Sequence, residues 1–208
     1  MKSIDELIDG AGELTERGLS KGEIADELNV SRETASWLVE QAGGEVSEAA
    51  DTQGPMDVHV DWSAIGRDSH RLSHIGIVMA DLLAAEGEEA DLTVGIGKSG
   101  APLATVVGRE LDTQLSVYVP SKYQWDDNDL EAKTGSFSRN FSEIEGRDCY
   151  IVDDNIDTGQ TMTETIERIR DRGGNPRAAV VLTDKFGKDE IDGVPIYSLV
   201  EIVHMRED

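Results

Sequence analysis

The residues best suited to chemistry lie between Cys149 and Met162, in the sequence CYIVDDNIDTGQTM. Four apolar residues from Cys149 predict a buried strand, and two carboxylates follow at Asp153 and Asp154. The segment Asp157–Thr161 then leads into a helical pattern. Backbone N–H groups at the start of a helix point outward, and the helix dipole favours an anion there. This stretch therefore predicts a phosphate-binding turn beside two acids.

Each residue type in this turn contributes to the predicted site. The hydroxyls of Thr158 and Thr161 can donate hydrogen bonds, and Gly159 permits a ligand to approach the backbone closely. Asp153 and Asp154 suit the vicinal hydroxyls of a sugar. We therefore expect a ribose 5-phosphate or a similar sugar phosphate as ligand. The residues expected to bind its phosphate are Asp157, Thr158, Gly159, Gln160 and Thr161.

The order of an apolar strand, two acids and then Thr-Gly-x-Thr resembles the phosphoribosyl-pyrophosphate signature of type I phosphoribosyltransferases. The resemblance extends over roughly residues 58–201 and implies that family's fold, its dimeric state and phosphoribosyl pyrophosphate as a further candidate ligand. Tyr150 and Asn155 depart from the pattern, because the family usually has aliphatic residues there.

A second Gly-rich turn follows the apolar run Leu92–Ile96. The resemblance identifies it with the family's pyrophosphate loop, formed here by Gly97, Lys98, Ser99 and Gly100. We expect a helix from Ala101, with Pro102 in its first turn. The turn also matches the dinucleotide fingerprint and the end of a Walker A loop. The first lacks the required acid after the next strand, and the second has Leu92 in place of its first glycine.

Other segments correspond to family features whose roles have plain alternatives. Residues 122–140 fall where the family has a mobile catalytic loop, and EAKTG at 131–135 resembles the orotate enzymes' loop without its histidine. Lys133 either contacts a pyrophosphate or is a solvated loop residue. Lys185 and Phe186 fall in the hood that contacts the base, or form a surface turn. Asp157 corresponds to an acid near the base in purine enzymes, or it balances the helix dipole.

Residues 20–41 have the pattern of a helix-turn-helix. Ser20 and Glu23 have the spacing of a capping box, and Asn29 stands where a left-handed residue would end the first helix. Ser31 would cap the second helix. The apolar positions are Ile24, Leu28, Val30, Ala35 and Leu38, with the small Ala25 where the helices cross.

The second of these helices would face a DNA major groove, where Arg32 can bond a guanine or a phosphate. The residues it would present are Ser31, Arg32, Glu33, Ser36 and Trp37. For Trp37, a place in the core or in a dimer contact is an equally good alternative to facing the groove. Residues 1–43 hold 4 basic and 10 acidic residues, a net charge of 4 − 10 = −6, which argues against DNA binding. A structural or dimerising helical cap is therefore the alternative.

The order of patterns along the chain predicts an α/β fold. Helical periods cover residues 4–42, 69–85 and 161–172, and apolar runs predict strands at 92–96, 115–119, 149–152, 178–182 and 196–202. Alternation of strands and helices indicates a mostly parallel sheet. We expect a helix-turn-helix domain over 1–43, a linker over 44–57 and a phosphoribosyltransferase-like, effector-binding domain over 58–208.

Composition limits the classes of protein that need to be considered. The chain has one cysteine, Cys149, which excludes an internal disulfide and a cysteine zinc cluster. No apolar run approaches the roughly 20 residues that span a bilayer, and the N-terminus has no signal-peptide core. We therefore expect a cytoplasmic protein without a membrane partner. We also expect no metal-ligand set and no required cofactor, with Mg²⁺ entering only alongside a pyrophosphate ligand.

Charge is the most unusual property of the composition. The chain has 19 basic and 43 acidic residues in 208, a formal net charge of −24, and only 7 of its bases are lysine. The acids are spread over the whole chain. This distribution is typical of proteins adapted to multimolar salt, where self-repulsion is screened. An ordinary acidic mesophilic protein is the alternative.

The combination of the two domains resembles the archaeal orotate-phosphoribosyltransferase-like regulators of the GfcR type, which are associated with sugar catabolism. The resemblance implies a homodimeric transcriptional regulator that binds promoter DNA and senses a sugar phosphate or phosphoribosyl pyrophosphate in its former catalytic pocket. It assigns no catalytic residue. The alternative is a working orotate or purine phosphoribosyltransferase with an accessory N-terminal domain.

Overall fold

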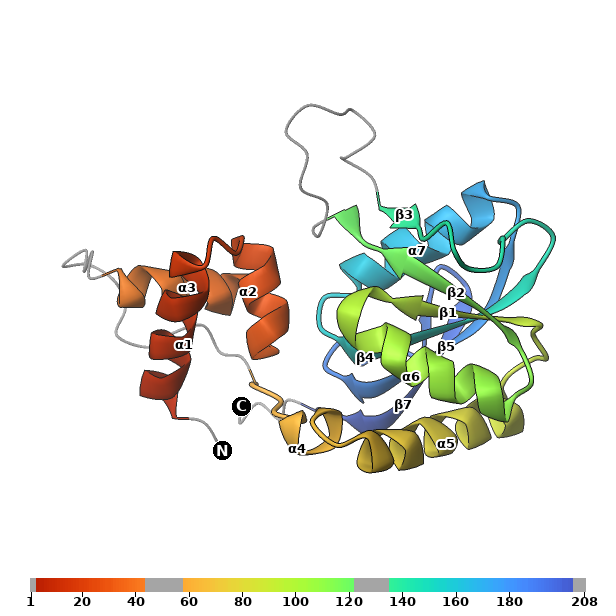
Figure 1. Ribbon diagram of the computed structural model, residues 1–208, viewed down its shortest axis with the longest axis horizontal. Helices are drawn as coiled ribbons and strands as arrows, with labels where there is room; N and C mark the ends of the chain where they lie inside the picture. Colours follow the sequence, from red (N-terminus) through yellow and green to blue (C-terminus); the bar gives the residue numbers. More distant parts are fainter. Residues whose placement is uncertain (1–2, 44–57, 122–134, 204–208) are drawn as a thin grey trace, which may run out of the picture. The chain divides into compact units, whose positions relative to one another are not determined.

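The computed structural model describes residues 3–43, 58–121 and 135–203 (Figure 1). The chain divides into two compact units, Met1–Ala64 and Ile65–Asp208. Within residues 3–43 the first unit contains three helices, and the described part of the second contains a sheet with helices on both faces. No helix among the described residues is long and apolar enough to cross a membrane.

The N-terminal unit is built from α1 (Ile4–Glu16), α2 (Lys21–Leu28) and α3 (Arg32–Ala42). Each helix begins at a serine whose hydroxyl accepts a backbone N–H bond: Ser3, Ser20 and Ser31. Asn29 ends α2 in the left-handed conformation, with φ 52°. The helix-turn-helix expected from the sequence is therefore formed as its capping residues indicate.

The core of this unit contains every apolar position expected for the helix-turn-helix. Its buried residues are Leu7, Ala11, Leu14, Ile24, Ala25, Leu28, Val30, Ala35 and Leu38. Ile4, although apolar, is outside this core and is 64% exposed. It is the first residue of α1, one turn before Leu7, and thus lies at the edge of the bundle.

The second unit is a seven-stranded sheet with the order β3-β2-β1-β4-β5-β7-β6. Its four central pairings are parallel, and the short edge strands pair antiparallel with β2 and β7. The mostly parallel α/β fold is thus confirmed. The strands are β1 (Leu92–Ile96), β2 (Gln114–Val119), β3 (Ser136–Phe137), β4 (Asp148–Ile156), β5 (Asn175–Asp184), β6 (Glu190–Ile191) and β7 (Val194–Glu201).

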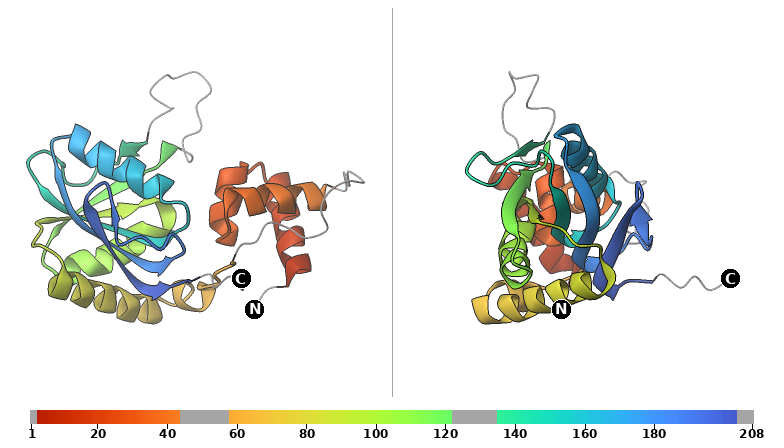
Figure 2. Two further views of the ribbon diagram at one scale, coloured as in Figure 1. Left: turned by 180° about the vertical axis from the view of Figure 1, so that it is seen from behind. Right: turned by 90° about the vertical axis from the view of Figure 1, so that its right-hand side faces the viewer.

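Helices cover both faces of the sheet (Figures 1 and 2). α7 (Gln160–Asp171) packs on one face through Met162, Ile166 and Ile169. α5 (Ser69–Glu86) and α6 (Gly97–Glu110) pack on the other, in a cluster that includes Met79, Leu83 and Leu103. The short α4 (Ser63–Gly66) precedes α5. Both faces of the central strands are therefore buried, as a parallel sheet requires.

Most boundaries differ from the sequence-based expectation by one to three residues, and two of the differences bear on the predicted site. α6 begins at Gly97 instead of Ala101, so Pro102 is its sixth residue and lies beyond the first turn. Gly97 makes the early start feasible, because it enters the helix with φ +57°, a conformation that favours glycine. β4 runs to Ile156, so Asp153 and Asp154 lie inside the strand and not after it.

Candidate functional site

The two Gly-containing turns singled out in the sequence follow adjacent strands of the sheet. β1 and β4 are parallel neighbours, with Leu92 opposite Cys149 and Gly95 opposite Val152. From β1 the chain continues to β2 on one side, whereas β4, β5 and β7 lie on the other. The strand order therefore reverses between β1 and β4. Open α/β sheets bind ligands outside the carboxyl ends of their strands at such a point.

The two helices that begin at this point differ from the other helices in their capping. Among the described helices of eight residues or more, α1, α2, α3 and α5 have a side-chain cap, which is Asp68 for α5. α6 and α7 have no side-chain cap and no acidic residue in the first turn. The first N–H groups of an α-helix have no partner inside the helix. Both starts can therefore offer these groups to an anion.

Glycines allow the start of α6 to approach the ends of β1 and β4. A Cβ on Gly100 would lie 2.5 Å from the Val152 carbonyl oxygen and 3.0 Å from Asp153 Oδ1. A Cβ on Gly95 would lie 2.7 Å from the Ala101 Cα. The predicted pyrophosphate loop is thus part of the first turn of α6 and lies directly against Asp153. Gly97 and Ser99 in this turn are half-buried, and Lys98 is exposed.

Asp153 and Asp154 are both buried, with 9% of each residue exposed. The Asp154 backbone N–H donates to Asp153 Oδ1 over 2.9 Å. Pairing with β5 extends β4 through these residues, and Thr183 Oγ1 donates to Asn155 Oδ1 over 2.8 Å. The hydrophobic pattern alone places the end of β4 too early, because Asp153, Asp154 and Asn155 near its carboxyl end are polar.

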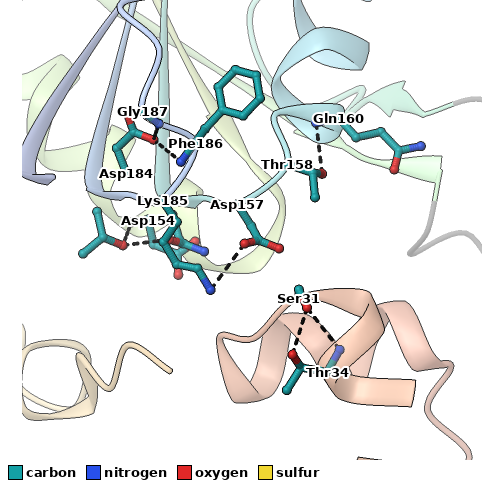
Figure 3. A network of polar contacts seen from close by, with 12 residues as sticks. Ser31, Thr34, Asp154, Asp157, Thr158, Gln160, Asp184, Lys185, Phe186 and Gly187 are labelled. Carbon is teal, nitrogen blue, oxygen red and sulfur yellow. Dashed lines mark hydrogen bonds and ion pairs between the residues drawn. The ribbon is translucent and has the colours of Figure 1, made fainter. Parts of the chain in front are cut away.

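The phosphate turn follows β4 and adopts the conformation that its glycine suggests. Gly159 has φ +76° and immediately precedes α7. The Gln160 backbone N–H lies 3.5 Å from Thr158 Oγ1, a long hydrogen bond (Figure 3). Thr158 and Gln160 are exposed, and Thr161 is half-buried. The start of α7 is therefore open to a ligand at Thr158 and Gln160.

Residues 185–188, the hood turn, follow β5 and contact residues 157–161, the phosphate turn. Lys185 Nζ lies 3.3 Å from Asp157 Oδ1 (Figure 3). A Cβ on Gly159 would lie 3.1 Å from Phe186 Cζ, so the phenyl ring packs on the glycine. Lys188 Nζ is 4.6 Å from the centre of the same ring, a cation–π contact. The sequence did not predict that the hood residues would engage the phosphate turn itself.

Asp184 fixes the backbone of the hood turn. Its Oδ1 accepts hydrogen bonds from the backbone N–H groups of Phe186, over 2.7 Å, and Gly187, over 3.1 Å (Figure 3). Sequence reasoning missed this residue, although an Asp followed by Gly three positions later is a common turn signal. Asp184 therefore orients both Lys185 and Phe186.

Glu164 on α7 is a second residue that the sequence did not reveal. Its Oε1 accepts hydrogen bonds from Tyr118 Oη over 2.7 Å, the Gly135 N–H over 3.0 Å and the Ser121 N–H over 3.2 Å. Burial, and then the adjacent Glu164 carboxylate, raise the pKa of Tyr118. Glu164 thus joins the end of β2 and the chain before β3 to the helix that begins at the phosphate turn.

Part of the predicted catalytic loop lies outside the described residues. This applies to residues 122–134, including Lys133, whereas Gly135 of the EAKTG sequence is described.

The predicted DNA-contacting residues belong to the other unit. Ser31 caps α3, and its hydroxyl accepts a hydrogen bond from the Thr34 N–H over 3.0 Å (Figure 3). Arg32 and Glu33 are exposed, and Ser36 and Trp37 are half-buried. Trp37 packs against the helical core, and its Nε1 is buried without a hydrogen-bond partner in the structure. Among the roles open to Trp37, namely a DNA contact, a core position or a dimer contact, the structure favours core packing.

Comparison with known proteins gives matches to the second unit and to the full-length chain. Residues 61–204 match the family described as phosphoribosyl transferase domain. Proteins named transcriptional regulator GfcR are 63% identical in Halorubrum lacusprofundi, covering 100% of both chains, and 60% identical in Haloarcula marismortui, covering 100% of this chain and 99% of that one. The protein of that name from Methanosarcina mazei is 44% identical, covering 99% and 100%.

Solved structures support the fold of the second unit. An adenine phosphoribosyltransferase from Thermoanaerobacter pseudethanolicus matches with a TM-score of 0.57 and 19% identity, covering 73% of this chain and 91% of that one. Mycobacterium tuberculosis orotate phosphoribosyltransferase in complex with 5-phospho-alpha-D-ribosyl 1-diphosphate matches with a TM-score of 0.53 and 19% identity, covering 69% and 80%. At this identity the likeness shows the fold alone.

Proposed function

The chain belongs to the phosphoribosyl transferase domain family and, over its full length, to the GfcR transcriptional regulators; we propose from this premise that it binds promoter DNA and senses a phosphorylated sugar. In this proposal the N-terminal helix-turn-helix contacts DNA. The phosphoribosyltransferase-like domain binds the effector at the carboxyl ends of β1 and β4. The regulated genes serve sugar catabolism, and the protein acts in the cytoplasm.

One observation carries the effector site. Two helices without side-chain caps, α6 and α7, begin after adjacent strands at the point where the strand order reverses. In the proposed complex the phosphate accepts hydrogen bonds from Thr158, Thr161 and the first amides of α7. The sugar hydroxyls contact Asp153 and Asp154. A second anionic group, if the ligand carries one, occupies the first turn of α6 at Gly97–Gly100.

The contacts of the hood support sensing over nucleotide synthesis. A transferase needs room for a base, and the resemblance assigns that role to Asp157, Lys185 and Phe186. Here Lys185 and Asp157 form an ion pair, and Phe186 packs between Gly159 and Lys188. A base would have to displace these contacts. A sugar phosphate bound at Thr158 and Thr161 leaves them intact.

The place of Mg²⁺ in this proposal depends on the ligand. Within 3–43, 58–121 and 135–203 the structure has no group of three or more His, Cys, Asp or Glu side chains that could hold a metal ion. We propose Mg²⁺ only as a companion of a pyrophosphate-bearing ligand. It would neutralise the ligand's phosphates, and the amides and hydroxyls named above would hold the ligand.

Isothermal titration calorimetry with ribose 5-phosphate and with phosphoribosyl pyrophosphate tests the effector site. Replacing both hydroxyls, in Thr158→Ala/Thr161→Ala, should weaken binding, because each hydrogen bond to a charged acceptor contributes about 1.5–3 kcal/mol. Thr105→Ala is the matched control, since the exposed Thr105 hydroxyl donates to the Ala101 carbonyl oxygen within its own helix. Equal affinity of the wild type and the double variant for every ligand that binds would contradict the proposed site.

Activity measurements separate the regulator from the alternative, a working orotate or purine phosphoribosyltransferase. That alternative is favoured by the Thr-Gly-Gln-Thr turn, which retains the family pattern. We expect no nucleotide formation from phosphoribosyl pyrophosphate with orotate, adenine or hypoxanthine. Turnover on the order of 1 per second or faster, as in ordinary enzymes, would favour the transferase.

DNA binding by two half-sites requires two helix-turn-helix units. Such proteins usually dimerise and contact half-sites about one helical turn apart. We therefore propose a homodimer as the regulatory form. Light scattering in molar salt should give twice the chain mass, and fluorescence anisotropy with promoter DNA should change when the effector is added. A monomer that binds DNA with full affinity would contradict the dimer.

A further inference from the structure

Two histidines on the exposed face of α5 have a geometry that the proposed regulator does not use. His70 and His74 are four residues apart, so their side chains lie on the same side of the helix. Their Nε2 atoms are 3.2 Å apart, and their ring centres are 4.5 Å apart. Both residues are exposed.

The distance between the two nitrogens matches that of two ligands on one metal ion. Imidazole nitrogens bind zinc at about 2.0–2.1 Å, so two of them are about 2.9 Å apart at a right angle and about 3.3 Å apart at the tetrahedral angle. The observed 3.2 Å lies between these values. A shared ion would place the ring centres about 5 Å apart if each ring pointed straight at it, so only a small ring rotation is needed.

Charged residues of both signs lie next to the pair in sequence. Asp68 Oδ1 accepts hydrogen bonds from the backbone N–H groups of His70 and Arg71, which fixes the first turn of α5. Two bases lie nearby in sequence, Arg67 and Arg71, and Arg71 forms an ion pair with Asp68 over 3.4 Å. The formal net charge of −24 also attracts cations to the surface.

We propose that His70 and His74 together chelate one divalent transition-metal ion, with Zn²⁺, Ni²⁺ and Cu²⁺ as the class of ligand. Neutral imidazole suits these ions, whereas Mg²⁺ and Ca²⁺ prefer oxygen ligands. Each histidine binds through Nε2, and water fills the remaining positions. The site is separate from the proposed sugar-phosphate site and does not depend on it.

Calorimetric titration of the full chain with Zn²⁺, in a buffer that does not chelate metals, tests the proposal. Wild type should bind through the pair, and His70→Gln and His74→Gln should each lower the affinity roughly tenfold or more, because the second imidazole no longer binds intramolecularly. His59→Gln should bind like wild type. Mg²⁺ titrated in the same way should give no binding that depends on the pair.

A relocation variant distinguishes chelation from histidine content. His74→Gln/Val78→His keeps the number of histidines but separates the two by eight residues, about 12 Å along the helix axis. Val78 is 49% exposed, so the substitution does not disturb the core. This variant should bind Zn²⁺ as weakly as His74→Gln, with an unchanged circular dichroism spectrum. Wild-type affinity in this variant, or in both single variants, would overturn the proposal.

Discussion

Arg32 is the only basic residue of α3, and it stands exposed in the first helical position after the cap Ser31. In a helix-turn-helix, residues at this end of the second helix contact base edges or flanking phosphates. If Arg32 bonds a guanine, Arg32→Ala should weaken operator binding by about 1–3 kcal/mol. A gel-shift titration at matched high salt measures the loss.

The control for Arg32 must remove a positive charge from the same unit without removing the contact. Lys21→Ala does so, because Lys21 lies on α2 and pairs with Glu40 over 3.6 Å. We expect Lys21→Ala to have the smaller effect and Glu33→Ala to tighten nonspecific binding. Equal operator affinity of Arg32→Ala and wild type would make the helix-turn-helix a dimerisation cap.

Loss of the Glu164 side chain should lower the stability of the second unit. Glu164→Ala removes hydrogen bonds from Tyr118, Ser121 and Gly135 and leaves the Tyr118 hydroxyl without its acceptor. Losing hydrogen bonds to a charged group and orphaning a buried donor should lower the free energy of unfolding by about 2–4 kcal/mol. Urea denaturation, with the exposed Glu167→Ala on the same helix as control, measures this; equal midpoints for the two variants would show that the hydrogen bonds contribute no net stability.

Individual residues of the phosphate turn could be predicted, but their partners could not. Thr158, Gly159 and Thr161 are recognisable because their order within a few residues indicates a phosphate-binding turn. The partner of Asp157 is Lys185, 28 positions later, and that pairing depends on how β5 and the hood turn return to the site. The partners of Glu164 could not be predicted either, since an acidic residue on an amphipathic helix normally lies on the solvent-exposed face.

At the scale of elements, Gly→Ala substitutions in two helices, α6 and α2, should have opposite effects on stability. Gly100→Ala should destabilise the protein by about 1–3 kcal/mol, because the added Cβ would lie 2.5 Å from the Val152 carbonyl oxygen. Gly22→Ala, in α2, meets nothing closer than 3.7 Å and should stabilise by about 0.5–1 kcal/mol. Thermal melts of both variants check the signs, and stabilisation by Gly100→Ala would show that α6 does not press on β4.

Elements with a continuous apolar core were predictable from the sequence, and their ends were less so. β1 begins and ends where its apolar run does, at Leu92 and Ile96. β4 extends past its apolar run because β5 pairs with Asp153 and Asn155. The two-residue strands β3 and β6 form only by pairing with β2 and β7, so no periodicity could indicate them.

For the whole molecule, the distribution of charge should decide the conditions under which it is folded. Forty-three acids in 208 residues repel one another, and folding brings them closer together. Screening acts over about 3 Å at 1 M salt but about 10 Å at 0.1 M, so removing salt exposes the repulsion. A dimer would carry twice the charge of one chain. The melting temperature should therefore fall as KCl is lowered from molar concentrations to 0.1 M.

Cys149 provides a direct measure of this loss of structure. Its side chain is fully buried in β4, and burial raises the pKa of the thiol to about 12, so in the folded protein it is both covered and protonated near pH 8. Thiolate is the reactive form, so a thiol reagent should label Cys149 slowly in molar KCl and rapidly after transfer to low salt. A labelling rate of Cys149 that does not change with KCl would show that charge repulsion does not unfold the protein at low salt.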